Sequence, residues 1–247
     1  MLDHDSYDWQ PAAATLEVLK TRGIPVVLVS SKTLAEIEGY RRAMVLPDPV
    51  VGENGAVIDV PPGYFPAGGP ATLATVDRKT LQEHFDAIRD GYDCISFAEL
   101  GPEGIAEVTG LPVDEAELAN RRRASEPILW NDSEEHLAVF TEAAAARGLT
   151  CIRGGRFVHL MGAFGKADAV SQLRFAYKRK WPDAILETIA LGDGPNDLDM
   201  LRAADVAVVI RGRHSHAMPL EDHARVLRPS LPGPAGWAEA MHQLIGV

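Results

Sequence analysis

The sequence predicts a two-domain α/β protein in which both ends of the chain build a parallel sheet and the middle forms an inserted α+β domain. Three observations support this fold class. Apolar strand-like runs alternate with segments of helical spacing near both ends of the chain. A proline- and glycine-rich segment at residues 61–70 separates the first block from the middle one. Towards the C-terminal end, an apolar run leads directly into the acidic turn GDGPND at residues 192–197.

The first block begins with a helix followed by a strand. Residues 12–22 place Ala, Leu and Val at helical spacing, and Gly23 is typical of a helix end. The continuous apolar run IPVVLVS at residues 24–30 suits a parallel strand with both faces buried. A second helix is expected over residues 33–44, followed by the short strands PVVGENG and AVIDV. We place this first part of an α/β core at residues 1–66.

The middle of the chain has a different pattern. The segment PPGYFPAGGP contains four prolines and three glycines, which interrupt regular structure and suit a domain boundary. Helices and strands then follow in an α+β order, and TCIRG and RFVHLMG are expected to form a hairpin around Gly154 and Gly155. We place this inserted domain at residues 67–162. Its other expected elements are helices at residues 79–89 and 133–147 and strands at residues 93–97 and 127–130.

From Lys166 the α/β pattern returns. We expect a helix as far as Tyr177, the strand ETIALGD, a helix over residues 196–203 and the strand VAVVI. This second part of the core covers residues 163–247. We expect the two ends of the chain to build one parallel sheet.

Composition and charge exclude several function classes. A formal charge of −11 disfavours a nucleic-acid partner, because phosphate backbones are bound through clustered Lys and Arg. The basic cluster Arg121 to Arg123 is short, and we interpret it as a solvated helix face.

No apolar run approaches the roughly 18 residues that span a bilayer, and the N-terminus lacks the pattern of a secretion signal. We therefore expect a cytoplasmic protein with no membrane partner. Cys94 and Cys151 are interpreted as buried small hydrophobes.

The acidic turn near the C-terminal end is the clearest candidate for a metal site. Asp193 ends the strand ETIALGD, and Asn196 and Asp197 follow at the start of a helix. In open α/β sheets ligands bind at the carboxyl ends of strands, and convergent carboxylate and amide oxygens suit Mg²⁺. The alternative interpretation is an acidic turn with a helix-capping residue. That alternative explains one acid rather than the whole segment.

The segment LGDGPNDLDML resembles the fourth motif of the haloacid-dehalogenase (HAD) phosphatase superfamily, whose members use its acids to bind Mg²⁺. VVLVSSK is similar to the second motif, which implies that Ser30 binds a phosphate oxygen. Lys166 resembles the third-motif lysine, which neutralises the phosphate and the nucleophilic carboxylate. Alone, such a serine is usually a helix cap and such a lysine a surface residue. Their common order around an insert implies a HAD-like Rossmannoid core with a cap domain.

A narrower resemblance covers nearly the whole chain: HDSYDW, SSKT, ENGA, SEPILW, GGRFVHLMG and GDGPNDLDML are similar to segments of the mannosyl-3-phosphoglycerate phosphatases. It implies a cap that closes over the phosphate site and a small anionic substrate, a phosphorylated sugar-glycerate. Lys32, Asn54 and Arg156 would suit this ligand, with Glu126 and His159 as weaker candidates. The structural alternatives are an exposed hairpin residue for Arg156, a tight turn for Asn54 and a satisfied structural histidine for His159.

One motif of the superfamily is missing. Its members begin with an apolar strand that ends in D-x-D-G-T, whose first Asp attacks phosphorus, and this sequence has no such segment. The stretch DHDS at residues 3–6 imitates the motif, but a strand usually takes roughly 5 residues and only Met1 and Leu2 precede it. The resemblance places residues 2–9 in the loop after the motif. We therefore expect that about a dozen residues, including the first core strand, are absent.

This absence has physical consequences. The missing strand is the central one in the fold, so we expect two neighbouring strands with unpaired edges and a groove in the core. Covalent catalysis is not available without the Asp nucleophile, and the metal site loses one ligand.

Three hypotheses about function follow. The first is a Mg²⁺-dependent phosphomonoesterase of a phosphorylated sugar-glycerate, inactive as this chain; the second is a non-catalytic phosphosugar-binding remnant; the third is an enzyme acting on another sugar phosphate, by hydrolysis or by phosphoryl transfer within a sugar.

Overall fold

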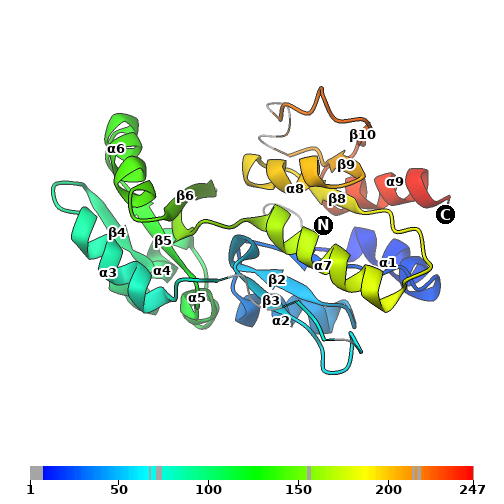
Figure 1. The fold of residues 1–247 in the computed structure, drawn as a ribbon. Coiled ribbons are helices and arrows are strands. Elements are labelled where there is room, and N and C mark those ends of the chain that lie inside the picture. Colours follow the sequence, from blue (N-terminus) through cyan, green and yellow to red (C-terminus); the bar gives the residue numbers. More distant parts are fainter. Residues whose placement is uncertain are drawn as a thin grey trace.

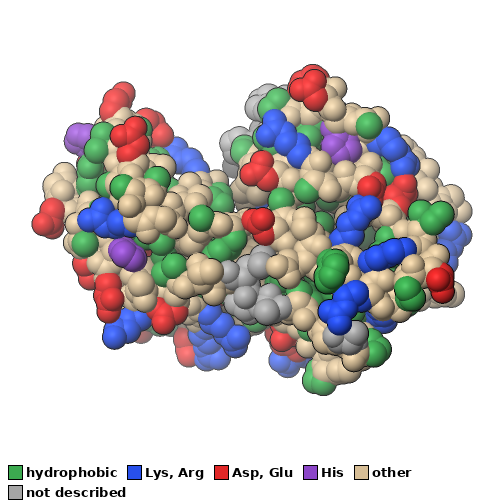
Figure 2. Space-filling model, viewed as in Figure 1, with side chains coloured by type: hydrophobic (Ala, Val, Ile, Leu, Met, Phe, Trp, Pro, Cys, Tyr) green, Lys and Arg blue, Asp and Glu red, His purple; other side chains and the backbone are tan. Residues whose placement is uncertain are grey.

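The computed structural model describes residues 8–66, 68–70, 74–154, 157–212, 215 and 218–246. These residues form two lobes, a core that contains both ends of the described chain and a cap formed by its middle part (Figure 1). A notch separates the lobes along one side of the space-filling view, and acidic and basic side chains are intermixed on the surface (Figure 2). The predicted α/β fold with an inserted cap is confirmed.

The N-terminal part of the core forms a three-stranded sheet in the order β1-β2-β3. Strand β1 pairs parallel with β2, and β2 pairs antiparallel with β3. A capping box starts the helix after β1, because Thr33 and Glu36 each accept a hydrogen bond from the other's backbone N–H. The elements are η1 (Gln10–Ala12), α1 (Ala13–Thr21), β1 (Leu28–Val29), α2 (Leu34–Ala43), β2 (Val50–Gly52), η2 (Glu53–Gly55) and β3 (Val57–Asp59).

The C-terminal part of the core forms a second three-stranded sheet, in the order β10-β9-β8, with all its strands parallel. Its central strand β9 is buried along its whole length, as its apolar sequence VAVV requires. The elements are α7 (Lys166–Lys180), β8 (Ile189–Gly192), η3 (Pro195–Asp197), α8 (Leu198–Ala203), β9 (Val206–Val209), β10 (Val226–Leu227) and α9 (Gly233–Ile245).

The cap is a four-stranded antiparallel sheet in the order β4-β5-β7-β6. Phe85 and Phe140, from two of its helices, pack edge to face over Ile128, Val158 and Leu160 of the sheet. Alternation along β7 therefore turns His159 to the opposite face. The elements are α3 (Arg78–Ile88), β4 (Cys94–Ser96), α4 (Phe97–Thr109), α5 (Val113–Asn120), β5 (Ser125–Trp130), α6 (Glu134–Ala145), β6 (Leu149–Gly154) and β7 (Phe157–Gly162).

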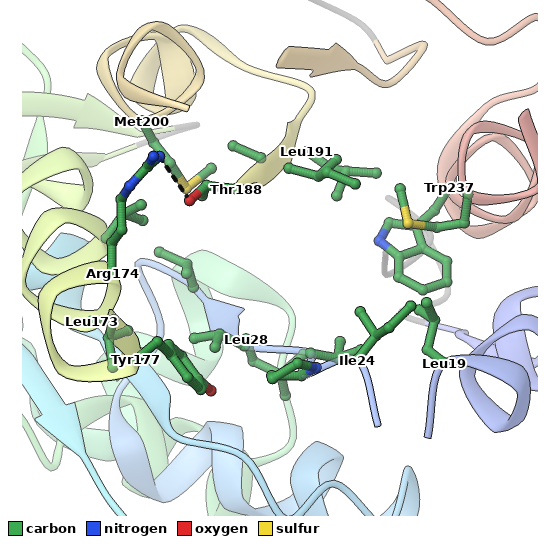
Figure 3. A pocket seen from close by; sticks show the side chains of 18 of the residues that line it. Leu19, Ile24, Leu28, Leu173, Arg174, Tyr177, Thr188, Leu191, Met200 and Trp237 are labelled. Atoms are coloured by element: carbon green, nitrogen blue, oxygen red, sulfur yellow. Dashed lines mark hydrogen bonds between the residues drawn. The ribbon is translucent and has the colours of Figure 1, made fainter. Parts of the chain in front are cut away.

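The two core sheets are not joined to each other. We expected one parallel sheet, but the described strands form separate β1-β2-β3 and β10-β9-β8 sheets. A cavity of about 460 Å³, lined by both β1 and β8, lies between them (Figure 3). Regular pairing is confined to Leu28–Val29 within the expected strand at residues 24–30, and β2 is the one strand paired with it among the described residues. The expected groove with two unpaired edges is thus present in the described part of the chain.

The parallel strands of both sheets have their carboxyl ends near the N-terminus of α7. A Cβ on Gly55, just beyond β2, would lie 2.3 Å from the Gly165 carbonyl oxygen. A Cβ on Gly192, at the end of β8, would lie 2.4 Å from the Asp197 Cβ. Asp197 in turn bonds to Lys166, the first residue of α7. The strand ends of both sheets therefore converge on one place. Among the described residues, no helix is long and apolar enough to cross a membrane.

The contact between Gly55 and Gly165 gives a testable prediction. Gly55→Ala is expected to lower the free energy of unfolding by roughly 2–4 kcal/mol, because the new Cβ would overlap backbone and Gly55 has a φ of +107°. Urea-induced unfolding followed by circular dichroism measures the change. Gly39→Ala is the matched control, since Gly39 lies in α2 with open space around it. This variant should raise the free energy of unfolding by up to about 1 kcal/mol. Equal effects at the two glycines would contradict the close approach.

Candidate active site

A buried ion pair lies at the point where the strand ends converge. The Lys166 Nζ donates to the Asp197 Oδ1 at 2.6 Å, and the two side chains are only 6% and 11% exposed. The other carboxylate oxygen of Asp197 accepts the backbone N–H of Asp193 at 3.1 Å. Lys166 can take this place because it is the first residue of α7, beside the end of β2. A charge-assisted bond of this kind fixes both groups in position.

The acidic turn supplies a second carboxylate. Asp193 directly follows β8, is exposed, and lines the cavity between the two sheets. Its carboxylate has no hydrogen-bond or ion-pair partner among the described residues. Asn196 lies in η3, and its side-chain oxygen is close to Gly194. A Cβ added to Gly194 would lie 3.0 Å from that oxygen. Asp193 is therefore the accessible acid of the turn, while Asp197 is engaged.

Ser30 and Lys32 lie at the end of β1 and line the same cavity. Ser30 is anchored to the neighbouring strand through its N–H, which donates to the Val51 carbonyl at 3.0 Å. Its hydroxyl accepts the N–H of Lys32 at 3.2 Å. The Lys32 ammonium group pairs with Glu36 at 3.1 Å, so much of its charge is compensated inside this lobe. Both predicted residues are thus near the site, and each already has a local partner.

Asn54 has an unusual environment for an amide side chain. It is 1% exposed, and neither its Nδ2 nor its Oδ1 has a hydrogen-bond partner among the described residues. Its backbone has a φ of 57°, and its N–H donates to the Ser30 carbonyl at 3.0 Å. Buried amides are normally satisfied, and strained backbone often marks a functional site. This pattern distinguishes Asn54 from an ordinary turn residue.

Glu53 ties the core to the cap. It is 1% exposed and its carboxylate accepts from the Arg123 N–H at 2.9 Å, the Ala124 N–H at 3.0 Å and the Ser125 hydroxyl at 2.7 Å. Its own φ of 51° is also in the left-handed region. Neither periodicity nor residue spacing indicates this role of Glu53 in the sequence. Glu53 therefore fixes the entry into cap strand β5 next to Asn54.

Arg122 is a site residue that the sequence interpretation missed. Its neighbours Arg121 and Arg123 are exposed, as expected for a solvated surface. The Arg122 guanidinium, however, donates to the Ser31 carbonyl at 3.2 Å and to the Ser125 hydroxyl at 2.9 Å. Its Nε is buried without a partner among the described residues. Interpreting the whole cluster as solvated was wrong for this one arginine, because it crosses from the cap to the core.

His159 is buried on the sheet face that α3 and α6 leave free. It is 5% exposed, its Nδ1 lacks a partner among the described residues, and its ring packs over Gly154. Burial, together with the charges of Arg122 and Lys166, lowers the pKa of the imidazole to about 3. The ring is therefore neutral near pH 7 and offers one unsatisfied nitrogen.

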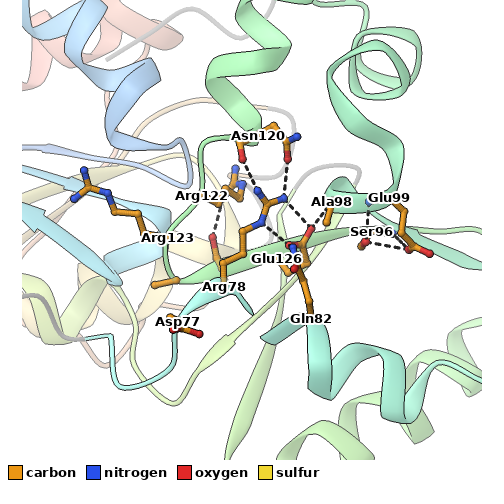
Figure 4. A network of polar contacts seen from close by, with 12 residues as sticks. Asp77, Arg78, Gln82, Ser96, Ala98, Glu99, Asn120, Arg122, Arg123 and Glu126 are labelled. Atoms are coloured by element: carbon orange, nitrogen blue, oxygen red, sulfur yellow. Dashed lines mark hydrogen bonds and ion pairs between the residues drawn. The ribbon is translucent and has the colours of Figure 1, made fainter. Parts of the chain in front are cut away.

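Glu126 belongs to a different network. It is fully buried and accepts from the Arg78 Nε at 2.7 Å, from the Gln82 amide and from the Ala98 N–H (Figure 4). Arg78 also bonds to Asn120 and thereby links three segments of the cap. Glu126 is thus occupied within the cap. Arg156, the other cap residue predicted to bind substrate, lies outside the described residues.

Solved structures of HAD phosphatases share the fold of this chain, an α/β core with an inserted cap. No family model matches the sequence. Three solved structures share the fold across almost the whole chain. A HAD-superfamily phosphatase from Bacteroides thetaiotaomicron has a TM-score of 0.66 at 18% identity, over 99% of this chain and 90% of its own.

The other two structures are sugar phosphatases. A sugar phosphatase of HAD subclass IIB has a TM-score of 0.67 at 15% identity, over 99% of this chain and 94% of its own. The sucrose-phosphatase from Synechocystis sp. PCC6803, solved with sucrose and phosphate, has a TM-score of 0.64 at 16% identity, over 96% of this chain and 91% of its own. At these identities the likeness establishes the fold of the chain.

The ion pair gives the second prediction. Lys166→Met or Asp197→Leu alone is expected to cost about 3–5 kcal/mol of unfolding free energy, because each leaves a buried charge without its partner. The double variant should cost clearly less than the sum of the two. Denaturant unfolding of the four proteins in the cycle measures the coupling. Lys79→Met removes an exposed pair with Glu83 at 3.7 Å and should have no measurable effect. Additive single effects would argue against coupling.

The third prediction concerns His159. Its folded-state pKa of about 3 lies below the ordinary histidine pKa of 6.5, so the unfolded chain binds the extra proton at intermediate pH. The stabilisation from neutral His159 is complete above pH 6.5 and is lost as pH falls towards 3. Below pH 6.5 the free energy of unfolding of the unchanged chain should therefore fall by up to about 1.4 kcal/mol per pH unit. His159→Gln should not show this fall. Unfolding curves between pH 7 and pH 4.5 test this, and parallel pH profiles would contradict it.

Proposed function

We propose that this chain carries the phosphate- and Mg²⁺-binding site of a phosphomonoesterase that acts on a phosphorylated sugar-glycerate of the mannosyl-3-phosphoglycerate type. The observation that carries the proposal is the convergence of both sheets on the Lys166–Asp197 pair, with Asp193 beside it. Lys166 and Ser30 would contact phosphate oxygens, because a buried ammonium group and a strand-end hydroxyl suit that anion. The core would comprise residues 1–66 and 163–247, and the cap residues 67–162.

The acidic turn partly fits a magnesium ion. Mg²⁺ is usually held by one or two carboxylates together with water and substrate phosphate. Asp193 offers a carboxylate without a partner among the described residues, whereas Asp197 already bonds to Lys166. Among the described residues no group of three acidic, histidine or cysteine side chains could hold a metal. We therefore propose a weak site of Asp193, Asp197 and Asn196, in which the ion would neutralise charge on the phosphate.

The sugar-glycerate part of the substrate would bind between the lobes. Asn54, Arg122 and His159 each present a buried polar atom that lacks a protein partner among the described residues. A ligand with several hydroxyl groups and a carboxylate would satisfy such atoms, and Arg122 would favour the carboxylate. Lys32 would complete this surface from the core.

A non-catalytic phosphosugar-binding role is the second candidate. It is favoured by one observation. In the described part of the chain no strand lies between β1 and β8, so no such strand places a carboxylate beside Lys166. The DHDS stretch at residues 3–6 lies outside the described residues. Binding without turnover is therefore our expectation for this chain.

The fourth prediction tests the site directly. In calorimetric titrations with inorganic phosphate present, Mg²⁺ is expected to bind this chain, and Asp193→Asn is expected to weaken it by more than about tenfold. Asp199→Asn is the matched control, because Asp199 lies two residues beyond Asp197 with an 87% exposed side chain and should leave binding unchanged. Equal weakening by both variants would indicate a non-specific charge effect.

Turnover is measured in the same samples as phosphate released from mannosyl-3-phosphoglycerate. We expect release indistinguishable from that of a sample without protein. Clear Mg²⁺-dependent turnover that is lost in Asp3→Asn or Asp5→Asn would overturn this expectation, because it would identify residues 3–6 as the nucleophile motif. Sucrose 6-phosphate, a second sugar phosphate, tests whether binding discriminates between substrates.

A further inference from the structure

The segment at residues 30–32, which follows β1 beside the proposed phosphate site, has a donor at each of its three carbonyls. Its first and third carbonyls accept the backbone N–H groups of Asn54 and Glu53, at 3.0 and 2.8 Å. Its middle carbonyl accepts the Arg122 guanidinium at 3.2 Å. Two of these donors belong to the core and the third comes from the cap. The segment therefore joins the two lobes.

The Glu53 side chain closes this connection from the other end. Its Oε2 accepts the Ser125 hydroxyl at 2.7 Å, and the same hydroxyl accepts the Arg122 guanidinium at 2.9 Å. Glu53 and Ser125 are 1% and 0% exposed, so water has little access to these bonds. Glu53, Ser125 and Arg122 form a relay, and with residues 30–32 the relay makes a closed ring of hydrogen bonds across both lobes.

The backbone at Glu53 shows that its position is imposed by these contacts. Its φ of 51° lies in the left-handed region, and Asn54 beside it has a φ of 57°. Such backbone persists only where the surrounding structure over-determines it. Here the carboxylate also accepts the N–H groups of Arg123 and Ala124 at the start of β5. Both lobes therefore fix the carboxylate to which the Ser125 hydroxyl donates.

Arg122 is a buried cation without a counter-ion in the described part of the chain. Its guanidinium donates to a carbonyl and a hydroxyl, and its Nε lacks any partner among the described residues. Burial lowers the pKa of this guanidinium, and the charges of Glu36, Glu53 and Glu126 oppose the shift. A buried charge whose bonds go to neutral groups is poorly compensated. An anionic group of a ligand would complete it.

Arg122 and Lys166 act on the same imidazole. Burial lowers the pKa of His159 to about 3, and the positive charges of Arg122 and Lys166 add to this effect. Charge interactions weaken with distance, so both cations lie near this ring. Arg122 also bonds to the carbonyl of Ser31, the residue next to Ser30. The proposed phosphate-binding groups and Arg122 are therefore neighbours.

We propose that Glu53 is a positioning residue that, through Ser125, aims the Arg122 Nε at a second anionic group of the ligand. That group is a carboxylate, whose planar geometry a guanidinium matches, while the phosphate ester lies at Lys166 and Ser30. The relay makes the site prefer a phosphate ester that also carries a carboxylate over one that carries a hydroxyl in its place. The proposal rests on the proposed function and adds the groups that set this preference.

Two ligands that differ at one end test the proposal. 3-Phosphoglycerate and glycerol 3-phosphate carry the same phosphate ester, but the first has a carboxylate where the second has a hydroxymethyl group. Calorimetric titration in the presence of Mg²⁺ measures the Kd of each ligand for the unchanged chain. We expect 3-phosphoglycerate to bind at least about tenfold more tightly, because its carboxylate pairs with Arg122.

Variants interrupt the relay at two different points. In Ser125→Ala and in Glu53→Gln the preference is expected to fall to within about twofold, with little change in the Kd of glycerol 3-phosphate. In the background of Arg122→Met, Ser125→Ala should change the preference no further. Ser96→Ala is the matched control, because it removes a 2% exposed cap hydroxyl that donates to Glu99 instead. This control should keep the full preference.

The ratio of the two Kd values separates positioning from folding. Loss of folded protein weakens both ligands equally and leaves the ratio unchanged. The proposal is overturned if both relay variants keep the preference, if the unchanged chain shows none, or if Ser96→Ala abolishes it too.

Failure of the proposed function has a different signature, because neither ester would then bind the unchanged chain. NMR of the Arg122 side chain still tests the relay in that case. Exchange of its Nε–H with solvent should be at least about tenfold faster in Ser125→Ala and unaffected by Ser96→Ala. An equal exchange rate in the unchanged chain and in Ser125→Ala would overturn the positioning role.

Discussion

The ion pair between Lys166 and Asp197 is the constraint on which the arrangement of this core depends. Since no backbone hydrogen bond connects the two sheets in the described part of the chain, side chains and helix packing must hold them together. Lys166 starts α7 beside the end of β2, and Asp197 lies against the end of β8. One buried ion pair therefore joins the strand ends of the two sheets.

Much of the fold could be predicted because its signals are local. The capping box at Thr33, the glycine after α1 and the apolar runs of β8 and β9 depend on short segments of sequence. The groove between the two sheets was also expected, from the family resemblance. One parallel sheet was expected as well, whereas the described strands form two sheets.

The candidate site could be predicted only in part. Glu53 and Arg122 could not be predicted, because each makes its contacts across the boundary between the lobes. Glu53 binds the backbone of Arg123 and Ala124, and Arg122 binds the Ser31 carbonyl. Contacts between residues about seventy to ninety positions apart leave no trace in periodicity or spacing. Glu126 was a weaker candidate for ligand binding, and its contact with Arg78, which is distant in sequence, gave no signal in the sequence either. The roles predicted for Ser30, Lys32, Asn54, His159 and the acidic turn stay predictions, supported by their positions.

The cap and the core differ in how complete their interiors are. All four cap strands pair in one sheet, and their aromatic cluster of Phe85, Phe140 and Trp130 is closed by α3 and α6. The core instead keeps a cavity between two sheet edges. Resistance to local unfolding follows the density of buried contacts and paired backbone, so it is unevenly distributed along this chain. By this physical argument local unfolding is expected to begin at β1 and β8 rather than in the cap sheet, and to expose their peptide groups to proteases.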